Sequence, residues 1–194
     1  MAIAMAKRIK IQDLEVEYEL IHRDVRCPRL EFNTGKLQVI LPRGYWNCQE
    51  LIDRHRNWIY RTATIIQNAL GESSKRKLNL ERTEDKFKGL VVNFMEMFSE
   101  ILGVHPKNIR FKRMRSRWGS CSFHKKNITI NMHLRYVPEH IIGYVVFHEL
   151  THLLEMRHTK IFWKRISRIY PDYKAIKKEL LMYWYLLQDE GLLE

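Results

Sequence analysis

The sequence is poor in cysteine, proline and glycine: its 194 residues include three cysteines, five prolines and eight glycines. Three scattered cysteines are too few for a disulfide framework or a four-cysteine zinc site, and an odd number without a pairing pattern suits a reducing compartment. The composition is not collagen-like, and a hydrophobic fraction of 45% argues against intrinsic disorder. We therefore expect a globular protein with a core of its own.

A long hydrophobic run is also missing. The first six residues are apolar but are followed at once by Lys7 and Arg8, which makes the run too short for a signal peptide. The longest later run, residues 141–147, falls far short of the roughly 20 residues of a membrane-spanning helix. We expect a cytoplasmic protein that does not enter a membrane.

Acidic residues are the minority charge. The chain has 34 Lys and Arg residues against 22 Asp and Glu residues, a formal net charge of +12. Such an excess favours polyanionic partners such as nucleic acid, nucleotides or an acidic membrane surface. A solvated basic surface without a dedicated partner explains the charge equally well.

The spacing of apolar residues changes along the chain and predicts an α+β fold. Residues 9–42 alternate as strands do and indicate a small antiparallel meander, and residues 51–70 have helical spacing. The polar segment 71–77 is the best candidate linker. We accordingly expect one domain over residues 1–80, a β-meander plus a helix, and a second domain over residues 81–194.

The second half predicts helices around a few strands. Proline fits the first position of a helix, so Pro138 is expected to begin one, and the apolar residues that follow cover most of that helix and predict its burial. A Gly119-containing loop is expected between two strands. The predicted strands lie near residues 109–114 and 128–132, and the other predicted helices span about 83–102, 159–170 and 172–188.

The motif with chemical content lies on the predicted buried helix. His148, Glu149 and His152 form an H-E-x-x-H pattern. Residues four apart on a helix differ by about 40° in direction and roughly 6 Å in height, so both imidazoles project toward a single ion. Glu149 points beside that ion, where it can polarise a water molecule. Two surface histidines explain the motif poorly, because an unpaired glutamate is costly in the most apolar helix of the chain.

An open catalytic zinc site has three protein ligands and leaves one position for water. His158 is the strongest candidate for the third ligand. On an uninterrupted helix it would face away from His152, so the helix must end near residues 155–157 and the chain must turn back. Thr159 supports this turn, because threonine can cap a new helix. Cys121 could supply a thiolate, but with three histidines at hand we expect a small packed residue there.

These residues and their neighbours resemble the YgjP-like metallohydrolases, which are related to the SprT-like and WLM metalloproteases of the zincin superfamily. The resemblance spans about residues 115–163 and continues more loosely into the N-terminal half. It is carried by residues 118–121 (W-G-S-C), 130–131, 144–146, 148–152, 158–159 and 162–163.

The resemblance implies a zincin-like metallopeptidase core over residues 81–194, in which a small antiparallel or mixed sheet accompanies the active-site helix. It also implies a zinc ion held by His148, His152 and His158, with Glu149 as the general base. The implied reaction is hydrolysis of peptide bonds in a protein or peptide substrate.

Three side chains near the motif are expected to contact the substrate: Arg115, Arg117 and Asn131. Stabilisation of the oxyanion is open between Arg115, Arg117 and Tyr170. In zincins an edge strand aligns an extended peptide above the active-site helix, and residues 128–132 are the candidate for that strand.

Two alternative functions remain. The first is a nucleoside-triphosphate pyrophosphatase, in which the arginines of the basic run over residues 110–118 hold phosphates. Such enzymes, however, prefer magnesium bound by oxygen ligands. The second is a nucleic-acid-associated protease of the SprT-like type. Its basis is the basic run over residues 110–118, where Phe111 and Trp118 could stack on bases. The competing interpretation of that run is a solvated strand face with the aromatic rings turned inward.

Overall fold

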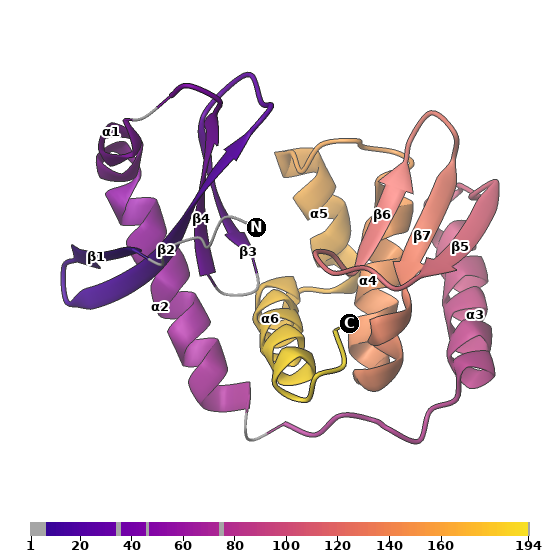
Figure 1. The fold of residues 1–194 in the computed structure, drawn as a ribbon. Helices are drawn as coiled ribbons and strands as arrows, with labels where there is room; N and C mark the ends of the chain where they lie inside the picture. Colours follow the sequence, from indigo (N-terminus) through magenta and orange to yellow (C-terminus); the bar gives the residue numbers. More distant parts are fainter. Residues whose placement is uncertain (1–6, 34–35, 46, 74–75, 194) are drawn as a thin grey trace. The chain divides into compact units, whose positions relative to one another are not determined.

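A computed structural model describes residues 7–33, 36–45, 47–73 and 76–193. The described residues contain both helices and two small sheets, which confirms the α+β class (Figure 1). The chain divides into two compact units, Met1–Glu72 and Ser73–Glu194, which are described separately. Within the described residues, every helix is too short or too polar to cross a lipid bilayer. The apolar residues 1–6 lie outside the described part.

As far as the structure describes it, the first unit has a four-stranded sheet and two helices. The sheet has the order β1-β2-β4-β3, and β2 runs parallel to β4, while β1 and β3 pair antiparallel with their neighbours. The expected antiparallel meander is therefore wrong in its order and in one strand direction. The elements are β1 (Lys7–Ile11), β2 (Leu14–Arg23), β3 (Arg29–Asn33), β4 (Lys36–Pro42), α1 (Cys48–Arg54) and α2 (Arg56–Ser73).

Burial explains why β4, and not β3, lies next to β2 in this sheet. Leu37, Val39, Ile40 and Leu41 of β4 are all fully buried, so both faces of this strand are covered and it takes an inner position. The shorter β3 carries an Arg29–Glu31 ion pair and lies at the edge, where charged side chains stay in water.

The single helix predicted over residues 51–70 is two helices. The ring of His55 donates to the Leu51 carbonyl, at 2.9 Å, which is the group that the N–H of residue 55 would bond in a continuous helix. That N–H bonds the Ile52 carbonyl instead, so α1 closes there and α2 begins at Arg56. The expected linker overlaps the last residues of α2, and its Ser74 and Lys75 lie outside the described residues.

In its described residues the second unit has a three-stranded sheet, four α-helices and one 3-10 helix, and α4 is its central element. Along α4 the residues are buried on nearly every side, and it packs against α3, α5, α6 and the strands β6 and β7 (Figure 1). The elements are α3 (Glu84–Leu102), β5 (Asn108–Lys112), β6 (Gly119–Ser122), β7 (Asn127–Asn131), the 3-10 helix η1 (Met132–Tyr136), α4 (Glu139–Thr151), α5 (Lys160–Ile169) and α6 (Tyr173–Asp189).

Two predictions about this sheet are wrong. The expected Gly119 loop contains a strand, β6, which pairs antiparallel with β7. The sheet order is β5-β7-β6, so β7, which covers most of residues 128–132, is the inner strand and cannot be the edge that receives a peptide. Ile128 and Ile130 are fully buried, which accounts for the inner position. The edge strand that contacts α4 is β6.

Threonine and glycine cap the helices of the second unit. Thr83 precedes α3 and accepts a hydrogen bond from the Lys86 N–H, and Gly103 ends that helix at a φ of 66°, which favours glycine. Thr159 caps α5 by accepting from the Phe162 N–H at 3.3 Å, as predicted. The cap at Thr159 fixes where the chain turns back toward α4.

Candidate metal centre and active site

The structure brings the three predicted ligand histidines together. His148 lies in the last turn of α4, His152 occupies its C-terminal cap position, and His158 lies in the turn before α5. One ligand atom from each lies within 4.8 Å of the other two, and the Nε2 atoms of His148 and His158 are 3.0 Å apart. The helix ends earlier than predicted, at Thr151, so the chain has the six residues 152–157 in which to reverse before His158.

These donors fit one divalent transition metal. Around a tetrahedral zinc ion with Zn–N bonds of about 2.0–2.1 Å, two ligand nitrogens lie about 3.3 Å apart. The separation of 3.0 Å between His148 and His158 is close to that value. The Nδ1–H of His152 donates to the Glu155 carbonyl at 3.1 Å, which leaves the Nε2 lone pair free to face an ion. Imidazole donors suit zinc and similar transition metals better than magnesium or calcium.

The imidazoles are held in the neutral form that a metal requires. Burial, and then the charges of neighbouring groups, lower the pKa of His148 to about 3. Burial also lowers the pKa of His152 and of His158. Because a protonated imidazole cannot bind a metal, these shifts remove competition from protons at neutral pH.

Glu149 lies beside the histidines and is enclosed by β6. The residue is 7% exposed, and a Cβ added at Gly119 would lie 2.6 Å from its Oε1. Only glycine therefore leaves room for this carboxyl group at its present position. Burial raises the pKa of Glu149 to about 8, and the positive charge of Arg117 opposes the shift.

The histidines and Glu149 open into a cleft of about 560 Å³. Its walls come from the segment before β6, from β6 itself, from α4 and from α6. Cys121 lies on this wall, where burial and the nearby Glu149 raise the pKa of its thiol to about 11. The thiol is therefore neutral, and Cys121 stands outside the histidine group, in agreement with a packed residue.

The three side chains expected to contact substrate lie in different places. Arg117 lines the cleft, whereas Arg115 is exposed and is absent from the described residues that line it. Tyr170, one candidate for the oxyanion, packs in the core against Phe98 and Phe147, and it too is absent from the lining.

Asn131 is fully buried, and its amide is fully used inside the chain. Nδ2 donates to the carbonyls of Met114 (2.8 Å) and Arg117 (2.7 Å), and Oδ1 accepts from the N–H groups of Met114 (3.2 Å) and His133 (3.1 Å). An amide has two donors and two acceptor sites, so none remains for a substrate. Asn131 therefore holds residues 114–117 in place by hydrogen bonds, and the expected contact with substrate is wrong.

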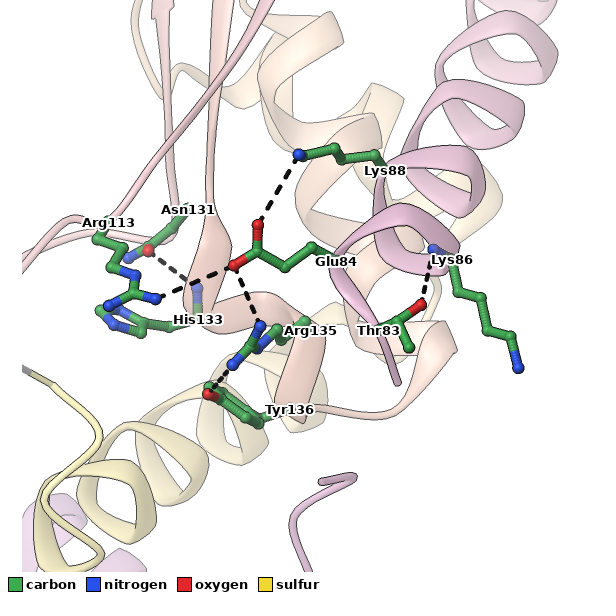
Figure 2. Close-up of polar contacts among 9 residues, drawn as sticks. All are labelled: Thr83, Glu84, Lys86, Lys88, Arg113, Asn131, His133, Arg135 and Tyr136. Atoms are coloured by element: carbon green, nitrogen blue, oxygen red, sulfur yellow. Dashed lines mark hydrogen bonds and ion pairs between the residues drawn. The ribbon is translucent and has the colours of Figure 1, made fainter. Parts of the chain in front are cut away.

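A second set of contacts holds the start of the same segment. Figure 2 shows Glu84, at the N-terminal end of α3, facing Arg113 and Arg135. Glu84 Oε1 lies 3.2 Å from Arg135 and 4.0 Å from Arg113, while Oε2 lies 3.8 Å from Lys88. Arg135 also bonds the Tyr136 hydroxyl and lies over its ring. Residues 113–117 are thus tied to α3 and η1 before they reach the cleft.

Sequence reasoning missed Lys177, which lines the cleft from α6. Its Nζ lies 4.9 Å from the centre of the Trp163 ring, and that ring stacks on His158 with centroids 5.4 Å apart. The charge of Lys177 contributes to the lowered pKa of His148 and of His158. A signal was present in the sequence, because Lys177 interrupts the apolar stripe that runs from Tyr173 to Leu180 at helical spacing.

The basic run has its aromatic rings turned inward. In β5 the exposed residues alternate with Ile109 and Phe111, and Phe111 contacts Phe87 with ring centroids 6.0 Å apart. Trp118 packs edge-on against Trp184, at 4.9 Å. This is the arrangement of a solvated basic strand face, and a nucleic-acid partner stays a prediction.

Comparison with known proteins identifies the family. A model of the YgjP-like, metallopeptidase domain family matches residues 65–182, which include all three histidines and Glu149. The chain belongs to the YgjP-like metallopeptidase family. As a member, this YgjP-like protein is a metalloprotease: it depends on a divalent metal and acts on a peptide or protein substrate.

Two solved structures resemble part of this YgjP-like chain. The metallopeptidase zymogen abylysin of Pyrococcus abyssi is 24% identical over 47% of this chain and 91% of its own, with a TM-score of 0.44. The metallopeptidase zymogen jannalysin of Methanocaldococcus jannaschii is 21% identical over 46% of this chain and 90% of its own, with a TM-score of 0.41. A search of the curated proteins found no match.

Proposed function

We propose that this protein hydrolyses peptide bonds at a zinc ion held by His148, His152 and His158, with Glu149 as the general base. The observation that carries the proposal is the convergence of the three imidazoles within 4.8 Å, beside a buried carboxyl group. The catalytic domain is proposed to span residues 81–194, as the sequence predicts.

Zinc, when bound, supplies Lewis acidity that acidifies water and polarises a carbonyl group. Glu149 takes the proton of the attacking water and delivers it to the departing amine. Its raised pKa suits both steps, because a group that exchanges protons near neutral pH works best with a pKa close to that pH. The positive charge of Arg117 favours the carboxylate form that accepts the proton.

The edge strand β6 is proposed to align the substrate. Gly119, Ser120 and Cys121 of this strand line the cleft, and β6 has a neighbouring strand on one side alone in the described sheet. An extended peptide can add to such an edge through main-chain hydrogen bonds. This assigns to β6 the role expected of residues 128–132.

The direct test is Glu149→Gln in the zinc-loaded protein, with an unfolded protein as substrate. We expect zinc to be retained and hydrolysis to fall by about a hundredfold or more, the usual effect of losing a general base. Glu139→Gln, at the exposed start of the same helix, is the matched control and keeps full activity. Full activity in Glu149→Gln would refute the assignment of the base.

The same preparation separates peptide hydrolysis from nucleotide hydrolysis. At equal zinc loading we expect cleavage of the unfolded protein and no release of phosphate or pyrophosphate from a nucleoside triphosphate. Three imidazole donors are a poor site for magnesium, the metal that nucleotide hydrolysis usually needs. Faster turnover of the nucleotide than of the protein would favour the pyrophosphatase alternative.

A further inference from the structure

Positive side chains outnumber negative ones on the walls of the cleft. Among the described residues that line it, Arg117 and Lys177 are cations, and Glu149 is the only acid. The three histidines are neutral, so an ion bound to them adds further positive charge. A negatively charged group that enters the cleft meets attraction from the wall and from the metal site.

Lys177 is available to such a group. It is an exposed residue of α6, and the contact its Nζ makes is with the face of Trp163. Within the described part of the chain, no carboxylate lies at ion-pair distance from it: Glu179, the nearest acid along α6, contacts Arg76 and His140 instead. Trp163 also stacks on His158, so the ammonium group is held close to the candidate metal site.

The rest of the wall is mostly apolar. Trp118, Phe123, Met156 and Leu180 line the cleft, and they can cover the hydrocarbon part of a peptide side chain. Arg117 also lines the cleft, and its charge acts on Glu149. Arg117 thus acts on the proposed general base, whereas Lys177 lies over Trp163, the ring that stacks on His158.

We propose that the cleft selects peptides with an Asp or Glu side chain next to the scissile bond, and that Lys177 is the residue that determines this specificity. The inference rests on the proposed peptidase function and names the substrate class of that site. An acidic side chain pairs with the Lys177 ammonium at a position where water is partly excluded by Trp163 and Leu180.

The experiment uses the full-length zinc-loaded protein. Cleavage sites in an unfolded protein are first mapped by mass spectrometry, and peptides are then made around a mapped site with Glu, Gln or Lys next to the scissile bond. We expect kcat/KM for the Glu peptide to exceed that for the Gln peptide about fivefold, as an ion pair with an exposed lysine allows. The Lys peptide is expected to be the slowest, and the preference for Glu is expected to weaken as salt is raised.

Two variants assign the preference to Lys177. In Lys177→Gln the ratio of kcat/KM between the Glu and Gln peptides should fall close to one. In Lys177→Glu the Lys peptide should be cleaved faster than the Glu peptide. Lys174→Glu is the matched control, because it makes the same charge change at an exposed position of α6 outside the cleft lining, and it should keep the wild-type ratio. Zinc content is measured in each variant so that rates are compared per bound ion.

Each outcome decides between the two proposals. Equal cleavage of the three peptides by the wild type, or an equal loss of rate on all of them in Lys177→Gln, would overturn the specificity while leaving the peptidase function intact. Failure of the zinc-loaded wild type to cleave any protein would overturn the proposed function and the specificity with it.

Discussion

His148 and Glu149 belong to the buried last turns of α4, whereas His158 comes from the exposed turn between α4 and α5. Apart from the side that opens into the cleft, Glu149 is enclosed by the close approach of Gly119, and His148 by the rings of Tyr144 and Phe162. His158 is held by ring contacts, chiefly with Phe162 and Trp163 of the following helix. The base is thus positioned by the core, and the last ligand by an aromatic stack.

We expect the largest loss of zinc affinity when a ligand on the buried helix α4 is removed. His148→Ala should lower zinc affinity by more than about a hundredfold, because removal of a ligand costs more than the loss of a supporting contact. Zinc competition with a chelator measures the affinity, and hydrolysis should disappear with the metal. His140→Ala, at an exposed position of the same helix, is the control with unchanged affinity. A wild-type affinity in His148→Ala would contradict the site.

Gly119→Ala should damage the base without removing the metal. The added methyl group would lie 2.6 Å from Glu149 Oε1, so the carboxyl group must move. We expect kcat to fall by about tenfold or more, since small displacements of a catalytic group are costly, with zinc content unchanged. The matched control is Gly89→Ala in α3, where an added Cβ meets nothing within 4 Å. Equal activities of the two variants would show that the close approach has no role.

Trp163→Leu should weaken the exposed end of the site. Loss of the stack on His158 is expected to lower zinc affinity by about tenfold, the lower range for a residue that orients a ligand. At saturating zinc most of the activity should return. A displaced Glu149 carboxyl group, as in Gly119→Ala, would lower the activity at any zinc concentration. Ile161→Ala, exposed on the same helix, serves as the control. An unchanged affinity in Trp163→Leu would mean that the turn itself positions His158.

The smallest effect concerns the stability of the metal-free protein. The pKa of Glu149 is raised by burial to about 8, so the folded chain holds a proton that the unfolded chain releases. The free energy of unfolding should therefore fall as pH rises toward 8. His148, with a lowered pKa, makes stability rise with pH, but only below about 6.5, the ordinary pKa of a histidine. The interval from about 6.5 to 8 thus isolates Glu149.

Thermal unfolding in a chelating buffer measures this dependence. The Tm of the wild type should decrease between about pH 6.5 and 8, and that of Glu149→Gln should stay nearly flat. A wild-type slope that persists in Glu149→Gln would assign the lost stability to other groups.

The sequence was informative where a local pattern carries the structure. The cap at Thr159, the apolar surface of α4 and the spacing of the three histidines along the chain all depend on residues near in sequence. The order of strands depends on which strand is buried on both faces, and that is decided by distant partners. For this reason the alternation of apolar residues does not give the positions of β4 and β7 in their sheets, and it does not reveal that β6 is a strand.

Some residues of the candidate site follow from local sequence patterns, and others reach it only through the fold. His148, His152 and Glu149 follow from helical spacing, and His158 from the need for a third ligand. Asn131 lay near the motif, but only the structure shows that its amide holds residues 114–117. Lys177 lies far along the chain, and its part in the cleft follows from the packing of α6 on α4.

The proposed catalysis requires above all one metal ion shared by three imidazoles. Anomalous X-ray diffraction from crystals of the zinc-loaded protein, recorded at the zinc edge, tests this directly. We expect one peak per chain, about 2.1 Å from a ring nitrogen of each of His148, His152 and His158. An empty triad in crystals grown with excess zinc, or a peak at other residues, would contradict it.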